Sequence, residues 1–105
     1  MKFRVVYADS FVRAVDAHVA YLRGQRVADR VITGWYENLF DKLDGIEDLP
    51  YMHPLDEAYT ARIGRSTRKV SFGDYIVYYQ VDDSSYQIEL VGFVHGASRR
   101  DANQR

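Results

Sequence analysis

The chain has 105 residues, of which 47% are apolar and 14% aromatic, and its 14 basic and 15 acidic side chains give a net charge of −1. This length fits one domain with its own core, and the near-zero charge disfavours binding to nucleic acid through bulk positive charge. The absence of cysteine excludes disulfides and cysteine nucleophiles and fits a reducing cytoplasm. No apolar run approaches the ~20 residues of a membrane-spanning helix.

The first predicted element is a strand over residues 2–7, where apolar and basic side chains alternate. A helix follows, with Asp9 or Ser10 as its N-cap and Gly24 as its expected left-handed end. Its apolar stripe consists of Phe11, Ala14, Val15, His18, Val19 and Leu22. Because His18 lies on this stripe, we expect a histidine at the edge of the core rather than a ligand.

A second helix is predicted over residues 26–44, ending at Gly45. Its stripe consists of Ala28, Val31, Trp35, Leu39 and Leu43, widened by Ile32 and Tyr36. The short break between the two helices predicts an antiparallel helical hairpin. Between residues 47 and 65 the periodicity fails around Pro50 and Pro54, with one short helical turn expected over 55–61.

The last third predicts three strands, over residues 67–72, 75–81 and 86–94, because β-branched and aromatic residues dominate there. Gly73-Asp74 indicates a tight hairpin between the first two. The predicted fold is therefore α+β and two-layered, with the helical hairpin packed on one face of a twisted, mainly antiparallel sheet in the order β-α-α-β-β-β. We expect one domain over residues 1–100 and a polar tail over 101–105.

The small net charge hides an asymmetry along the chain. Residues 41–57 hold one lysine against six carboxylates, a net charge of −5. Residues 62–69 hold four basic side chains and no acid, and the three arginines near the C-terminus oppose only Asp101. If the two basic segments meet, they attract an anionic partner over roughly a 10 Å Debye length; the alternative is that they pair with the acidic segment at the surface.

The run Lys69–Asp83 with its Gly73 hairpin and paired tyrosines, followed by Ile88–Gly96 and the arginines at 99 and 100, resembles the RelE/ParE superfamily of bacterial toxins. The resemblance spans nearly the whole chain and is strongest over residues 68–101. It implies the toxin of a type II toxin–antitoxin system of the plasmid-stabilisation kind, neutralised by a small cognate antitoxin. RelE-like members cleave mRNA on the ribosome, whereas ParE-like members block DNA gyrase.

Departures from the RelE-like pattern favour the ParE-like branch. Where RelE-like nucleases carry an arginine after the tyrosine that matches Tyr75, this chain has Ile76. Of their paired lysines, one matches Lys69 and the other falls on Thr67. His95 stands near a C-terminal histidine acid of some members, but Gly96 follows it instead of a terminal tyrosine; its other interpretation is a turn leaving the sheet.

Three functions stay open at this point. The first is a ParE-like inhibitor of gyrase, whose target-binding residues are Arg65, Arg68, Arg99 and Arg100. The second is a ribosome-dependent endoribonuclease that uses His95, Lys69 and Arg68, assisted by Arg65, for proton transfer and phosphate stabilisation. The third is a degenerate member without toxicity.

The same pattern gives partner predictions. Ile76, Tyr78 and Tyr79 are the predicted antitoxin-binding residues, on the expectation that Tyr78 and Tyr79 point to opposite faces and one of them is exposed. The three histidines share no metal-ligand spacing, so we expect neither a metal nor a cofactor. We expect a cytoplasmic protein that does not engage a membrane.

Overall fold

The computed structural model describes residues 3–96, so the predicted polar tail and Arg99 and Arg100 lie outside the described residues. The element order is β1 (Arg4–Tyr7), α1 (Asp9–Gly24), α2 (Asp29–Asp44), η1 (Gly45–Glu47), α3 (Glu57–Ile63), β2 (Arg68–Phe72), β3 (Tyr75–Asp82) and β4 (Gln87–His95). One sheet has the strand order β1-β4-β3-β2. Only β1 and β4 are parallel, which confirms the predicted α+β class and mainly antiparallel sheet.

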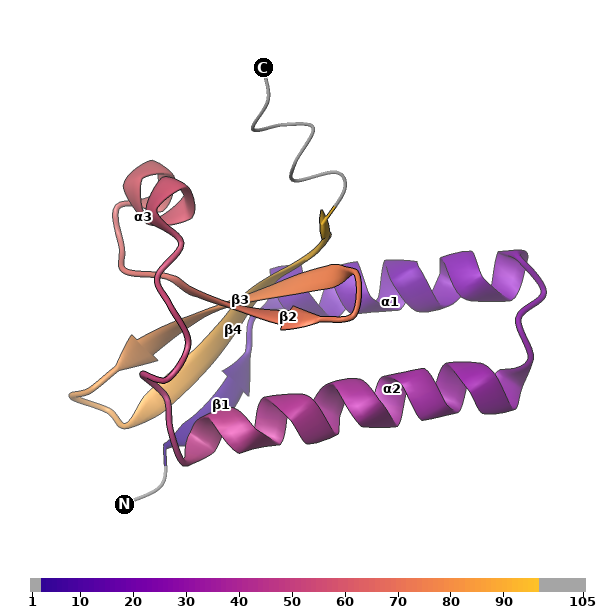
Figure 1. Cartoon of the computed structure of the whole chain (residues 1–105), viewed down its shortest axis with the longest axis horizontal. Helices are drawn as coiled ribbons and strands as arrows, with labels where there is room; N and C mark the ends of the chain where they lie inside the picture. The colour runs from indigo at the N-terminus through magenta and orange to yellow at the C-terminus, as the bar shows by residue number, and fades with distance from the viewer. Residues whose placement is uncertain (1–2, 97–105) are drawn as a thin grey trace.

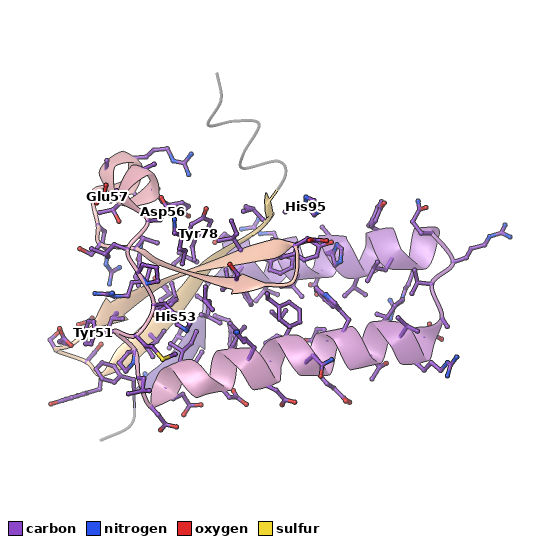
Figure 2. The ribbon with its side chains drawn as sticks, in the orientation of Figure 1. Tyr51, His53, Asp56, Glu57, Tyr78 and His95 are labelled. Carbon is purple, nitrogen blue, oxygen red and sulfur yellow. The ribbon has the colours of Figure 1, made fainter. Side chains whose placement is uncertain are left out.

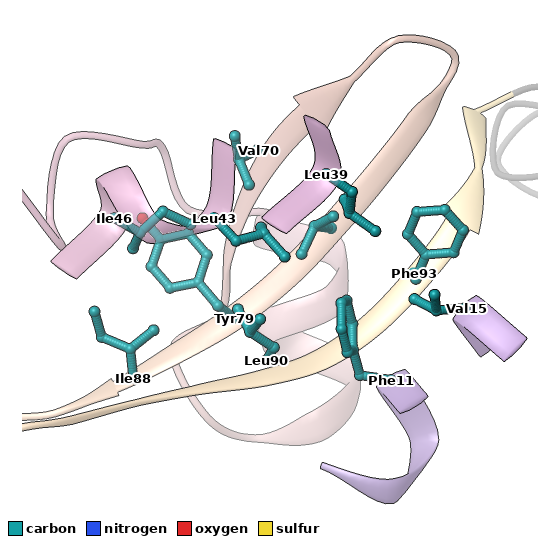
Figure 3. Packing of buried hydrophobic residues seen from close by; sticks show 11 residues of the cluster. Phe11, Val15, Leu39, Leu43, Ile46, Val70, Tyr79, Ile88, Leu90 and Phe93 are labelled. Atoms are coloured by element: carbon teal, nitrogen blue, oxygen red, sulfur yellow. The ribbon is translucent and has the colours of Figure 1, made fainter. Parts of the chain in front are cut away.

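The two long helices run side by side, and α3 lies apart from them (Figure 1). Both long helices supply the core on one face of the sheet, which confirms the predicted hairpin packing. The core consists of Phe11, Val15, Leu39, Leu43, Ile46, Val70, Val77, Tyr79, Ile88, Leu90 and Phe93. Figure 3 shows Phe11 and Val15 of α1 beside the end of β4, and Leu43 of α2 near Tyr79. Burying each such side chain contributes about 1.5–3 kcal/mol before entropy is counted.

The helix ends differ from the prediction. Helix α1 has Ala8 as its N-cap with no side-chain cap, because the Ser10 hydroxyl donates instead to the Val91 carbonyl at 2.6 Å. The left-handed residue after α1 is Arg26 (φ 62°) rather than Gly24. The connection therefore continues to residue 28, and α2 begins three residues later than expected.

The apolar stripe of α2 is narrower than predicted. Ile32, Leu39 and Leu43 are buried, whereas Val31 is 53% exposed and Tyr36 also faces solvent. Trp35 is half-buried and packs on the core, as expected. The sheet covers only part of the helical hairpin. Val31 lies about 100° around the helix from Ile32, so it points away from the sheet and has nothing to pack against.

The β2–β3 hairpin has the predicted register, with Phe72 paired to Tyr75 and Gly73 at φ +57°. A positive φ at the first turn residue is the type II′ geometry that suits right-handed strand twist. Between β3 and β4 the register shifts at Tyr78/Tyr79. This irregularity leaves one extra residue in β4 and keeps Leu90 and Phe93 both on the core face.

Residues 48–56, here called the strap, lead from the end of α2 past the edge of the sheet to α3. The buried Tyr79 hydroxyl donates to the Pro50 carbonyl at 2.8 Å. Arg68 donates to the His53 carbonyl at 2.7 Å and to the Tyr51 carbonyl at 3.4 Å. A β-bridge between Leu55 and Arg68 completes the attachment. The strap is therefore held mainly by hydrogen bonds, of which the one from Tyr79 is buried and the one from Arg68 to His53 is partly buried.

Helix α3 begins and ends at recognisable signals. The buried Asp56 carboxylate accepts from the Tyr59 N–H at 2.9 Å, and Gly64 ends the helix at φ +80°. The short turn expected over residues 55–61 is thus a real helix displaced by two residues. The Tyr59 ring stacks on Tyr78 from the sheet face opposite the long helices, with centroids 4.3 Å apart.

An aromatic cluster joins the helical hairpin to the sheet. The His18 ring of α1 lies 4.7 Å from Trp35 of α2 and 4.6 Å from Tyr75 of β3, measured between centroids. The Tyr75 hydroxyl lies 3.0 Å from His18 Nε2, and Phe93 stacks on Tyr75. His18 is therefore a histidine at the core edge, as predicted. Burial lowers the pKa of His18, and nearby His95 lowers it further.

We predict that Arg68→Ala lowers the free energy of unfolding by about 2 kcal/mol, because the change removes two charged hydrogen bonds that hold the strap. Arg68→Lys should recover only part of this loss, since an ammonium cannot place a planar guanidinium over the Tyr51 ring. Urea denaturation measures the difference, with the exposed Arg65→Ala as the matched control. Equal stabilities of the two alanine variants would contradict the role of Arg68 in fixing the strap.

We predict that His18 makes stability depend on pH. Its folded pKa lies below the unfolded value of about 6.5, so the neutral ring contributes in full above that value. The contribution is lost as the pH falls through the folded pKa, because the unfolded chain then binds the proton more readily. Unfolding midpoints at neutral and mildly acidic pH should therefore fall more steeply for the natural chain than for His18→Gln. Parallel slopes for the two proteins would contradict this.

Candidate functional site

Arg68, a predicted target-binding and catalytic residue, turns toward the protein. Besides its two hydrogen bonds to the strap, its guanidinium carbon lies 5.0 Å from the centroid of the Tyr51 ring. Arg68 pairs with Tyr79 across the hairpin, so it emerges on the core face of β2 and reaches the strap around the strand edge. The charged group of Arg68 is therefore used to hold the strap through its backbone carbonyls.

The other basic side chains of the segment differ in what they contact. Lys69 Nζ lies 3.8 Å from the buried Asp56 carboxylate, and Arg62 lies over the Tyr59 ring with a centroid distance of 5.0 Å. Arg62 and Arg65 are both exposed, at the end of α3 and just beyond it. Within residues 62–69, the outward positive charge is therefore concentrated near the end of α3 rather than along β2.

His95 lies at the end of β4, as predicted, and is exposed. Its ring meets Tyr75 edge-on at 5.1 Å, and the Gly96 N–H donates to the Asp74 carbonyl at 2.7 Å. Both residues line a hollow of about 370 Å³ together with Ser71, Gly73, Asp74, Tyr75 and Ile76. The Tyr75 ring contacts both His95 and His18, so exposed His95 packs against the edge of the aromatic cluster.

The candidate nuclease residues do not converge. Lys69 pairs with Tyr78, under α3, whereas His95 pairs with Tyr75, which faces the long helices. The two side chains therefore leave opposite faces of the sheet. Two strand spacings and three residues of rise separate their backbones by about 14 Å. With Arg68 committed to the strap, no shared position for a scissile phosphate exists among Arg68, Lys69 and His95.

Neither Tyr78 nor Tyr79 is exposed, although one of them was expected to be available for antitoxin binding. Tyr79 is fully buried and Tyr78 is 3% exposed. The reason is that the core encloses Tyr79 while α3 covers Tyr78, where Gly92 leaves room for the stacked rings. Figure 2 shows Tyr78 close to α3. Of the three predicted residues, only Ile76 stays partly exposed, on the open part of that face.

An apolar groove between α1 and α2 was not predicted as a site. It encloses about 220 Å³ and is lined by Tyr7, Phe11, Val12, Val15, Asp16, Tyr36 and Phe40. Tyr7, Val12 and Tyr36 are exposed although they are large and apolar. Burial and the carboxylates of Asp44 and Glu47 raise the pKa of Tyr7, so acidic groups stand near the groove. The signal in the sequence was an apolar stripe on α2 too wide for the sheet alone.

Neither a metal-binding cluster nor a membrane-spanning helix is present within residues 3–96. Within that range no three histidine, cysteine or acidic side chains gather as a metal site would require. His53 is a strap residue, and burial together with nearby Lys42 lowers its pKa. No helix in the same range has the length and apolarity to cross a membrane.

Comparison with known proteins fits this geometry. No curated protein matches the sequence. The RelBE2 toxin–antitoxin complex of Mycobacterium tuberculosis contains a chain with a similar fold, with a TM-score of 0.55 and 15% identity over 90% of this chain and 99% of that one. The family described as the ParE toxin of the type II toxin–antitoxin system parDE matches residues 5–100. This chain therefore belongs to the ParE toxin family of type II toxin–antitoxin systems.

Proposed function

We propose that this chain arrests bacterial growth in the cytoplasm by binding a macromolecular target, DNA gyrase, and does no cleavage chemistry of its own. The separation of Lys69 from His95 and the engagement of Arg68 by the strap carry this proposal. A nuclease needs a base, an acid and phosphate-stabilising cations around one scissile bond. A binding protein needs only a surface of suitable shape and charge.

The target-binding surface in this proposal begins at the exposed arginines near the end of α3. Arg65 supplies a charge-assisted contact there, and Arg99 and Arg100 supply others from the C-terminal segment. Arg68 is an indirect contributor, because it fixes the strap and the start of α3 on which Arg65 depends. Contacts of this kind raise the association rate and weaken with salt.

The cognate antitoxin, in this proposal, places an amphipathic helix in the groove between α1 and α2. Apolar side chains on one face of a helix match a groove lined by exposed Tyr7, Val12 and Tyr36. Asp16 at the groove favours a lysine or arginine beside those apolar positions. This location replaces Tyr78 and Tyr79, whose side chains offer little surface, and leaves Ile76 as a secondary contact.

We predict that purified full-length protein stops supercoiling by DNA gyrase in vitro, and that truncation after Gly96 abolishes both this inhibition and growth arrest. The combined Arg65→Ala, Arg99→Ala and Arg100→Ala variant should lose most of the inhibition while keeping its unfolding midpoint. Arg30→Ala, exposed on α2, is the matched control. Full supercoiling at saturating toxin would exclude gyrase as the target.

The ribonuclease alternative rests on exposed His95 beside the hollow at Tyr75. Primer extension on cellular mRNA during induction separates the two functions, since codon-phased cuts would indicate cleavage on the ribosome. A catalytic His95 would lose roughly 10²–10⁴-fold in activity on change to alanine. We expect intact messages and a His95→Ala variant that still arrests growth.

We predict that Val12→Glu with Tyr36→Glu weakens binding to the antitoxin encoded by the neighbouring reading frame by at least roughly 100-fold, because both side chains line the groove and charges there oppose apolar burial. Calorimetric titration of the purified partners measures the effect. Val31→Glu, exposed on the same helix but outside the groove, should bind normally. Unchanged affinity of the groove variant would exclude this surface.

A further inference from the structure

The strap exposes an unusual group of apolar side chains. The Met52 N–H donates to the Leu49 carbonyl at 3.1 Å, which closes a turn with Pro50 at its second position. Leu49, Tyr51 and Met52 are 58%, 49% and 61% exposed, while Pro50 is buried. Turns at the surface usually carry small or polar residues, so three large apolar side chains here indicate an interface.

This turn is rigid before any partner arrives. The Pro50 carbonyl accepts from buried Tyr79, and the Tyr51 hydroxyl donates to the Asp83 carboxylate in the β3–β4 turn. The Tyr51 ring also lies over the Arg68 guanidinium. A fixed aromatic side chain loses little entropy on binding and is typical of interface hot spots. Asp48 and Asp83 give the rim of the turn a negative charge.

A recess lies on the other side of His53 from this turn. It encloses about 430 Å³ between the strap, the end of α2 and the edge of the sheet, and is lined by Lys42, His53, Pro54, Lys69, Val70, Ser71 and Ile76. Figure 2 shows Tyr51 and His53 on the same strap, beside the sheet. Of the two lysines at the recess, Lys69 stands beside the buried Asp56 carboxylate and Lys42 is exposed, and three of the lining side chains are apolar.

The sheet edge at the recess is also uncovered. The strap pairs with the start of β2 through the Asp56 N–H to the Thr67 carbonyl and the Lys69 N–H to the Pro54 carbonyl. From Val70 to Phe72, the outer edge of β2 has no strand beside it within residues 3–96. An exposed strand edge favours contact with another chain.

We propose that two copies of this chain form a closed two-fold dimer, in which the Leu49–Met52 turn of each copy occupies the lysine-lined recess of the other. The turn is apolar with an acidic rim, and the recess is partly apolar with basic side chains, so the two are complementary. They are neighbours on one surface, which is what a two-fold axis requires. A different partner would need only one of the two features.

Sedimentation velocity of the purified full chain over roughly two decades of concentration tests the dimer. Leu49→Ser with Met52→Ser should weaken association at least roughly 30-fold. The matched control, Val31→Ser with Ile63→Ser, removes equally exposed apolar side chains elsewhere and should dimerise normally. A chain that is monomeric throughout, or a dimer that the turn variant leaves intact, would overturn the proposal.

A charge exchange tests the pairing itself. Lys42→Glu and Asp48→Lys should each weaken the homodimer, while an equimolar mixture should form a heterodimer because both of its contacts are again attractive. Failure of the mixture to associate would overturn the arrangement. Titration with the antitoxin gives the remaining outcome: if the turn variant lowers antitoxin affinity and the natural chain stays monomeric, the turn is an antitoxin surface and the dimer is wrong.

Discussion

The buried hydroxyl of Tyr79 is the constraint on which the rest of the molecule depends. A phenol in the core needs a hydrogen-bond acceptor, and the Pro50 carbonyl is the one it has. Burial raises the pKa of Tyr79 to about 12, so it remains a donor at any physiological pH. The strap must therefore pass this point, and Arg68 then fixes its next residues. The strap then places Asp56 where its carboxylate caps α3, on the face of the sheet opposite the long helices.

The path of the strap determines which basic side chains of residues 62–69 remain available to a partner. Read along the sequence, four basic side chains in eight residues look like one patch. In the structure Arg68 donates to strap carbonyls and Lys69 stands beside Asp56. Of these four side chains, only Arg62 and Arg65 are exposed. The positive charges on β2, those of Arg68 and Lys69, therefore mainly stabilise the fold. The outward charge that remains suits attraction of a large partner better than stabilisation of a single phosphate in a transition state.

The sequence predicted the strands, the Gly73 hairpin and the two-layer packing, because alternation and turn chemistry are local signals. It could not predict that Val31 would be exposed and Ile32 buried, since this depends on where the sheet ends beneath α2. Tyr78 and Tyr79 were correctly assigned to opposite faces. The burial of Tyr78 was missed because α3, seven residues long and placed by Asp56, covers the second face. The fate of Arg68 was equally hidden, as its acceptors are backbone atoms fifteen and seventeen residues away.

The surfaces that remain for partners are separate in the fold. The groove between α1 and α2 lies on the helical layer, the Leu49–Met52 turn and its recess lie at the β2 edge, and exposed Arg62 and Arg65 lie at the end of α3. An antitoxin helix in the proposed groove site would therefore leave the proposed dimer contact open. An antitoxin that neutralises this chain from the groove must act by reaching the α3 end with the rest of its length, or by excluding the target sterically. In either case inhibition comes from occupying surface, which agrees with a protein whose candidate catalytic groups never meet.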